Sequence, residues 1–151
     1  MIELRDVNAD NWREVVSIEP RGDQRRFVAS VSFYLNVCHY GGVWQPLALY
    51  HDGEPVGFAM WAYDTEDDSH WIGGLVIDGK HQGKGYGRAA LEALLAHLAA
   101  QPGYRETALS YEPDNSVARR LYASLGFVET GERVEDELVA RRPADDSTMR
   151  R

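Results

Sequence analysis

The stretch that decides the fold is Gln82-Gly83-Lys84-Gly85-Tyr86-Gly87, which stands between a predicted strand and a predicted helix. Its glycines leave no Cβ between the backbone and a ligand, and they permit the positive φ angles of a tight turn. The N–H groups of such a turn converge at the N-terminus of the following helix, where the helix dipole is also positive. The loop is therefore predicted to bind an anion, with Lys84 and Arg88 adding positive charge. Glycines that only initiate a helix would give the same local pattern.

Two common phosphate-binding motifs fit this loop poorly. In the Walker pattern, Asp78 would replace the first glycine, and Gly85 follows Lys84 where a Ser or Thr is required. The dinucleotide fingerprint can be fitted only loosely to the glycines. Residues 78–81 also separate those glycines from the strand that should lead directly into them. An ATP-binding loop is disfavoured, and a dinucleotide site is the weaker alternative.

The hydrophobic pattern alternates between strand and helix periods along the chain. Strands are predicted at residues 2–5, 47–50, 55–63, 70–77, 107–111, 127–130 and 137–141, and helices at 10–18, from 23 to the glycines at 41–42, at 88–101 and from 114 or 115 to 125. The helix at 88–101 connects two strands and makes them parallel. We expect an α/β (α+β) fold with a mixed, mostly antiparallel twisted sheet of about six or seven strands, flanked by about four helices.

Composition restricts the class of protein. The 151 residues fit a single domain, which we place at residues 1–142 with a polar tail at 143–151. The net charge of −8 weighs against nucleic-acid or anionic-membrane partners. Cys38 is the only cysteine, so the chain can form no internal disulfide and no cysteine-paired zinc site, and we expect no metal. Without a long apolar run or a signal-like start, a cytoplasmic location is expected.

A second motif gives the loop a more specific meaning. Residues 115–127 carry Asn115, then Ala118, Leu121-Tyr122 and Gly126-Phe127 at fixed offsets. In this order, the Gln-x-x-Gly-x-Gly loop and this stretch resemble the two signatures of the GNAT superfamily of N-acetyltransferases, and the resemblance extends over residues 2–142. It implies an acetyl-CoA-dependent enzyme of the GNAT fold, with the central parallel strands splayed at the cofactor site. Segments 27–30, 56–58, 86–92 and 109–115 are similar to the bacterial diamine and polyamine (spermine/spermidine) branch, which implies a small cationic amine as acceptor.

The resemblance also implies how acetyl-CoA is held. The pyrophosphate would lie on the glycine loop. The main chain of Leu75, Val76 and Ile77 would pair with pantetheine as another strand would. Asn115 would hydrogen-bond the pantetheine arm, or only cap its helix. Arg119 would lie near the phosphates, or only in solvent.

The resemblance implies direct transfer without a covalent enzyme intermediate, and it makes Tyr122 the general acid. A phenol has a pKa of about 10 and keeps its proton at neutral pH, although packing alone would explain the spacing of Tyr122 equally well. Many relatives carry a Glu on the strand before the loop, where this chain has Gly73 and Gly74. We therefore expect Glu112 to be the base, with His70 second.

The acceptor pocket is predicted to draw on the first two helices and on the acidic loop at residues 64–69, with aromatic residues of the neighbouring strands. Aromatic faces bind ammonium groups and acidic side chains offset their charge, although most of these aromatics would serve equally well in the core. The predicted pocket residues are Tyr34, Trp61, Tyr63, Asp64 and Trp71. The glycines at 73 and 74 would leave room for a bulky acceptor.

Several functions are compatible with these motifs. A polyamine or diamine is the preferred acceptor, followed by an aminoglycoside-like antibiotic and then a protein or peptide amine. The missing strand Glu also keeps a non-catalytic acyl-CoA sensor open. An exposed strand near the C-terminus would allow a homodimer.

Overall fold

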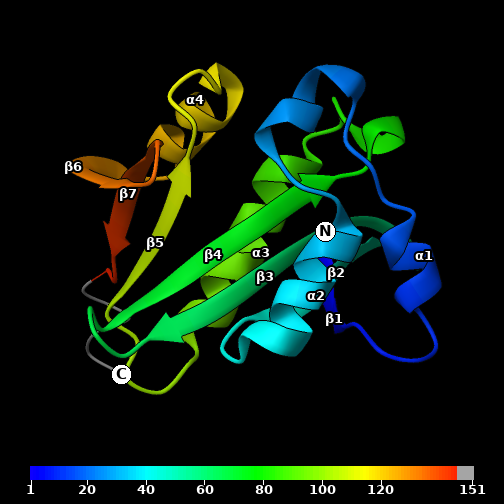
Figure 1. Ribbon diagram of the computed structural model, residues 1–151, viewed down its shortest axis with the longest axis horizontal. Helices are drawn as coiled ribbons and strands as arrows, with labels where there is room; N and C mark the ends of the chain where they lie inside the picture. The colour runs from blue at the N-terminus through cyan, green and yellow to red at the C-terminus, as the bar shows by residue number, and fades with distance from the viewer. Residues whose placement is uncertain (146–151) are drawn as a thin grey trace.

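A computed structural model describes residues 1–145, and its strands form one twisted seven-stranded sheet (Figure 1). The strands are β1 (Glu3–Asp6), β2 (Gln45–His51), β3 (Glu54–Asp64), β4 (Ser69–Ile77), β5 (Glu106–Tyr111), β6 (Val128–Val134) and β7 (Glu137–Pro143). Their order is β1-β2-β3-β4-β5-β7-β6, and β4 and β5 are parallel while the other neighbours are antiparallel. The expected mixed, mostly antiparallel sheet is confirmed.

Four α-helices accompany the sheet in the described residues: α1 (Trp12–Val16), α2 (Val31–Gly41), α3 (Tyr86–Ala99) and α4 (Ser116–Ser124). The prediction of one continuous helix starting at Asp23 is wrong. The segment forms a short 3₁₀ helix, η1 (Gly22–Phe27), then an extended residue at Val28, and then α2. The break is stabilised because the Ser30 side chain caps α2 by accepting from the Phe33 N–H (3.1 Å), and the Tyr34 hydroxyl accepts the Ala29 N–H.

The helices cover the two faces of the sheet differently. The leucine stripe of α3 is buried against alternate residues of the strands, including Ala59, Ile72, Leu109 and Tyr111. On the opposite face, α1 and α2 bury Val15 and Val31 against the other set of side chains, such as Phe58 and Met60. This alternation follows the period of two in a strand, and it assigns each strand residue to one face.

The sheet opens between its two parallel strands. The ladder between β4 and β5 consists of His70 with Thr107 and Trp71 with Ala108, and beyond it the strands diverge (Figure 1). β5 instead pairs along its whole length with β7. On the other side of β4, a bulge against β3 coincides with Gly74, whose φ is +58°. The splay expected for the central parallel pair is present.

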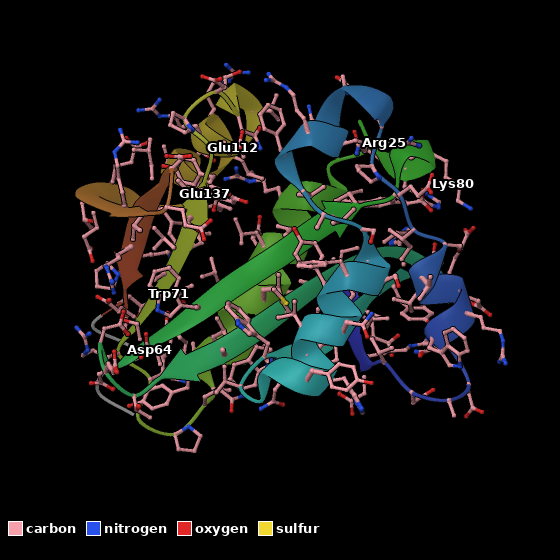
Figure 2. The ribbon with its side chains drawn as sticks, viewed as in Figure 1. Arg25, Asp64, Trp71, Lys80, Glu112 and Glu137 are labelled. Carbon is pink, nitrogen blue, oxygen red and sulfur yellow. The ribbon has the colours of Figure 1, made fainter. Side chains whose placement is uncertain are left out.

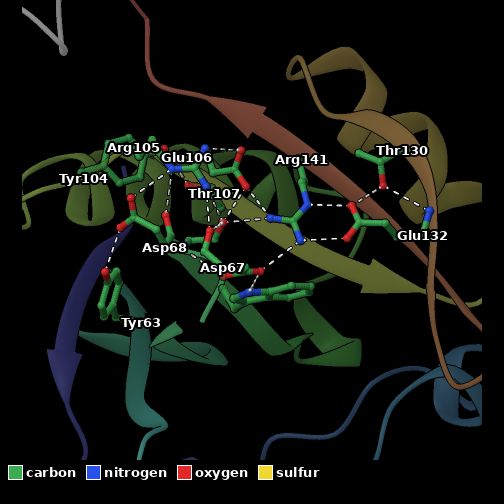
Figure 3. Close-up of polar contacts among 12 residues, drawn as sticks. Tyr63, Asp67, Asp68, Tyr104, Arg105, Glu106, Thr107, Thr130, Glu132 and Arg141 are labelled. Carbon is green, nitrogen blue, oxygen red and sulfur yellow. Dashed lines mark hydrogen bonds and ion pairs between the residues drawn. The ribbon is translucent and has the colours of Figure 1, made fainter. Parts of the chain in front are cut away.

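A polar cluster holds the end of the sheet where β4 and β5 still pair (Figure 3). The Arg141 guanidinium on β7 contacts Glu106 on β5, donates to Asp67 in the β3–β4 hairpin (3.0 Å), and donates to Glu132 on β6 (2.9 Å). Arg105 adds a bond to the hairpin through Asp68. These bonds hold the N-terminal ends of β4 and β5 together, so the two strands diverge only toward their C-terminal ends.

The C-terminal boundary differs slightly from the expected one. Strand β7 includes Pro143, and Ala144 is buried with its N–H bonded to the Arg105 carbonyl (2.9 Å). The first residues of the expected tail, 143–151, therefore belong to the folded sheet, and residues 146–151 lie outside the described residues. Within residues 1–145, no helix has the length and apolar character needed to cross a membrane.

Candidate active site

The opening between β4 and β5 forms a cavity of about 1040 Å³. It is lined from one face of the sheet by η1 and α2, including Tyr34, and from the other face by α4, including Tyr122. The glycine loop borders it where α3 begins. The cavity therefore connects a helix N-terminus with side chains from both faces of the sheet.

The glycine loop has the conformation that an anion site requires. Gly83 and Gly85 have φ angles of +81° and +79°, and no atom lies within 4 Å of where their Cβ atoms would be. Both line the cavity together with Gln82, Tyr86 and Gly87. The Gln82 side chain donates to the Ile77 carbonyl (3.0 Å), which holds the loop to the end of β4. The open space and the unsatisfied N–H groups of the first turn of α3 suit a phosphate group.

The exposed edge of β4 faces the same cavity. Leu75, Val76 and Ile77 line it beyond the point where β4 leaves β5. Main-chain groups at such an edge can pair with the amides of an extended ligand. The Ile77 carbonyl already accepts a hydrogen bond from the Gln82 side chain, so the main-chain groups of Leu75 and Val76 are better placed to bind a ligand.

The cations expected near the anion do not line the cavity. Arg119 is bound in a two-bond pair to Glu129 (2.7 and 2.9 Å), which also accepts from Tyr111. Arg88 donates to Ser124 on α4 and lies 3.4 Å from the Glu92 carboxylate. Lys84 is exposed on the loop. For Arg119 in particular, the structure favours a structural pair over the expected position beside phosphate.

Tyr122 projects from α4 toward the cavity. Its ring packs against those of Tyr111 (5.3 Å between centroids) and Phe127 (5.9 Å), so it contributes to packing as well as to the cavity wall. Burial, together with the charge of Glu137, raises the pKa of Tyr122 to about 12. Its hydroxyl forms no hydrogen bond with any of residues 1–145. The group is thus a protonated donor over the whole neutral range.

The predicted acceptor residues divide into two sets. Tyr34 and Trp71 line the cavity. Trp61 is buried on the α3 face beside His97, because its place in β3 points it away from α2. Tyr63 donates a hydrogen bond to Asp68, and Asp64 is the last residue of β3, far from Glu112 (Figure 2). The prediction that Trp61, Tyr63 and Asp64 form an acceptor pocket with Tyr34 is therefore not supported.

The room expected beside the two strand glycines is already filled. A Cβ on Gly74 would lie 3.1 Å from the Tyr34 ring, and one on Gly73 would lie 3.2 Å from Trp44 and Met60. The glycines allow these side chains to approach the backbone closely, so the positions that their Cβ atoms would take are occupied, although both glycines still line the cavity. The Tyr34 ring also stacks on Phe58.

The second predicted base lies outside the cavity. His70 is 3% exposed and is surrounded by the rings of Trp61, Tyr63 and Tyr104. Burial lowers its pKa. His70 is buried and is not among the residues that line the cavity, so it is a core residue.

Sequence comparison decides the family. A sequence model of the Acetyltransferase (GNAT) family matches residues 2–127. The chain belongs to the GNAT family. It is 33% identical over 140 residues to the spermine/spermidine N(1)-acetyltransferase of Bacillus subtilis, an alignment that covers 87% of this chain and 90% of that relative. The expectation of an acetyl-CoA-dependent N-acetyltransferase is confirmed.

Solved structures show the same GNAT fold. Spermidine N-acetyltransferase from Vibrio cholerae, in complex with CoA and spermine, superposes with a TM-score of 0.74 at 18% identity, covering 99% of this chain and 98% of that one. An aminoglycoside acetyltransferase in complex with coenzyme A gives a TM-score of 0.80, also at 18% identity, covering 99% and 98%. At this identity the likeness concerns the architecture.

Sequence reasoning missed several residues that line the GNAT cavity. Glu135 and Glu137 border it from the hairpin between β6 and β7. In Figure 2, Glu137 lies on the same side of the opening as the predicted base Glu112. Arg26 of η1, and Arg21 just before η1, border it from the other side. Charged residues in a turn and in a surface-like segment are usually solvated, and no local pattern distinguished these.

Proposed function

We propose that the enzyme transfers the acetyl group of acetyl-CoA to a primary amine of a small polycation, a polyamine or diamine. The observation that carries this proposal is the acidic wall, which we define as Glu112, Glu135 and Glu137 along the β5–β7 side of the cavity. Carboxylates spaced along one wall suit an acceptor with more than one ammonium group. The aromatic rings of Phe33 and Tyr34 lie on the opposite wall and offer cation–π contacts.

The cofactor is proposed to occupy the cavity from the glycine loop to Tyr122. The loop amides and the N-terminus of α3 would hold the pyrophosphate. The edge of β4 at Leu75 and Val76 would pair with the pantetheine amides. Asn115 supports this arrangement from α4: its side-chain oxygen accepts the Ala118 N–H (3.3 Å), which leaves its N–H₂ group as a donor toward the cavity it lines.

Tyr122 is proposed as the general acid. Acetyl-CoA supplies an activated thioester, and the leaving group is a thiolate that needs a proton. With a pKa of about 12 and no competing hydrogen bond within residues 1–145, the Tyr122 hydroxyl keeps its proton until such an anion develops. Burial of the ring between Tyr111 and Phe127 limits its rotation and so fixes the direction of the donor.

A thiol-release assay with acetyl-CoA and a panel of amines tests the substrate class. The panel contains spermine, spermidine, putrescine, an aminoglycoside and a lysine peptide. We expect the highest kcat/KM for an acyclic amine with at least two ammonium groups. Preference for the aminoglycoside or the peptide would refute the polyamine assignment, and tight CoA binding without turnover of any amine would indicate a sensor.

Substitution of Tyr122 tests the acid. Tyr122→Phe removes the hydroxyl but keeps the ring packing, so kcat should fall by about 100-fold while the Kd for CoA, measured by calorimetry, changes little. Equal losses in kcat and CoA affinity would indicate that the hydroxyl only supports cofactor binding.

A further inference from the structure

Glu137 is a fixed carboxylate at the cavity wall. It begins β7, just after a turn in which Glu135 has a φ of +54°. The Ser110 hydroxyl on β5 donates to its Oε1 atom at 2.7 Å. The side chain is half-buried and lines the cavity, and within residues 1–145 it forms no ion pair. One carboxylate oxygen is therefore positioned by the protein, and the other is left for a ligand.

The pleat of β5 determines which side of the sheet this carboxylate faces. Leu109 and Tyr111 belong to the core cluster with α3. Since side chains alternate along a strand, Ser110 points to the opposite face, toward α2. Glu137 is hydrogen-bonded to Ser110 and so lies on the face that also carries Tyr34. This is the side of the opening away from the α3 core.

The charge of Glu137 reaches two of the tyrosines that line the cavity, Tyr34 and Tyr122. After burial, which is the larger cause, its negative charge contributes to raising the pKa of Tyr34 and of Tyr122. The carboxylate is thus close to the groups that border the opening from either face. A partly buried anion without a cationic partner is unfavourable, and an ammonium group is the ligand that would complement it.

We propose that Glu137 binds the ammonium group of the acceptor and removes its proton, with Ser110 as the positioning residue. This inference rests on the proposed amine acetylation and identifies the base that the missing strand Glu leaves unassigned. One ammonium proton passes to Glu137, which leaves a neutral amine with a free electron pair. That pair forms the C–N bond as the C–S bond breaks, the sulfur takes a proton from Tyr122, and the second nitrogen proton returns through water to the tyrosinate. The proton on Glu137 is released to solvent.

Glu112 is less suited to this step. It follows the last residue of β5, and its carboxylate has no hydrogen-bond partner within residues 1–145 that would fix it. General-base catalysis depends on a carboxylate held within reach of the proton it removes. Glu112 can contribute charge to the acidic wall, whereas Glu137 has the anchored geometry.

The test compares wild type with Glu137→Gln in the thiol-release assay, using spermidine and varying the pH from about 7 to about 10. An aliphatic ammonium has a pKa near 10.4, so rising pH supplies the neutral amine from solution and replaces the base. We expect kcat/KM of Glu137→Gln to be lower by about 100-fold or more near pH 7, and the gap to narrow toward pH 10. Tyr122 stays protonated over this range, so the acid is not lost.

Matched variants separate this role from a structural one. Glu14→Gln makes the same change on the exposed surface of α1, outside the cavity, and should leave the rate unchanged. Ser110→Ala should lower the rate less than Glu137→Gln does, with the same narrowing at high pH. Thermal unfolding and CoA affinity of each variant verify that the fold and cofactor site persist.

The outcomes are distinct. A pH-dependent gap for Glu137→Gln establishes the base. A gap that stays constant with pH, or full activity near pH 7, overturns it and returns Glu112, just after β5, as the candidate base. Absence of wild-type turnover with every amine would instead remove the proposed function on which the inference rests.

Discussion

Replacing Arg141 by Met should lower the free energy of unfolding of the protein. The Arg141 side chain is 17% exposed and its partner Glu106 is 12% exposed, so these two charges are largely removed from water. Removing one partner of a buried pair costs about 3–5 kcal/mol, because the other charge remains buried. Ser69 and Arg105 still contact Glu106 after the change, which places the expected loss at the low end, about 3 kcal/mol.

Urea unfolding followed by tryptophan fluorescence measures this loss, and Tm should fall by roughly 6–12 °C. Arg133→Met is the matched control, because that arginine on β6 is exposed and forms no ion pair within residues 1–145; it should change stability by less than about 0.5 kcal/mol. Adding Glu106→Gln to Arg141→Met should recover part of the lost stability, because it removes the buried carboxylate charge that has lost its partner. A loss below about 1 kcal/mol for Arg141→Met, or strictly additive effects in the double variant, would refute the assignment of a buried network.

Three further predictions concern the site and its walls. Gly74→Ala should lose about 1–3 kcal/mol more than Gly131→Ala, because both positions have a positive φ but only Gly74 would also press on the Tyr34 ring; equal losses in urea unfolding would exclude that contact. Asn115→Asp keeps the helix cap but removes the N–H₂ donor, so calorimetry should show weaker CoA binding at unchanged Tm, and unaltered affinity would limit Asn115 to capping. Hydrogen bonds from Arg119 and then from Tyr111 lower the pKa of Glu129 in the folded protein. The ionised carboxylate therefore stabilises the fold above its unfolded-state pKa of about 4.3, and this stabilisation is lost as the pH falls through the folded-state pKa. The free energies of unfolding of wild type and Glu129→Gln should converge below about pH 4.3, and curves that stay parallel would contradict this.

The order of elements could be predicted from sequence because each strand and helix has its own periodicity and its own stop signals. The hairpin at Asp52 and Gly53 has the positive φ angles that an Asp-Gly turn requires, and Asn115 caps α4 as expected. The helix predicted from Asp23 failed because one apolar spacing continues through η1 and α2. What divides them is the Ser30 cap and the bond from the Ala29 N–H to Tyr34, and the second of these depends on tertiary structure.

The loop side of the site was predictable and the acceptor side was not. Glycine positions and a helix start are local features, so the sequence alone predicts an anion site there, and the open, positive-φ loop is consistent with that prediction. The acceptor side depends on register: Trp61 and Tyr34 look alike as aromatic residues, yet the pleat of β3 turns Trp61 toward α3. Glu137 joined the cavity only through the pairing of β7 with β5, a relation between segments that no local pattern reveals.

The divergence of β4 from β5 places a strand edge in the interior of a sheet. Edges at the border of a sheet attract other chains and promote aggregation, and proteins protect them with charge, bulges or coverings. Here the edge lies at the bottom of a cavity, with η1 and α2 along one side and α4 along the other. A second polypeptide strand could pair with this edge only if there were space for its side chains on both faces of the sheet. An unbranched ligand has no such side chains and needs no such space. The fold thus keeps backbone hydrogen-bonding groups available for recognition while shielding them from self-association.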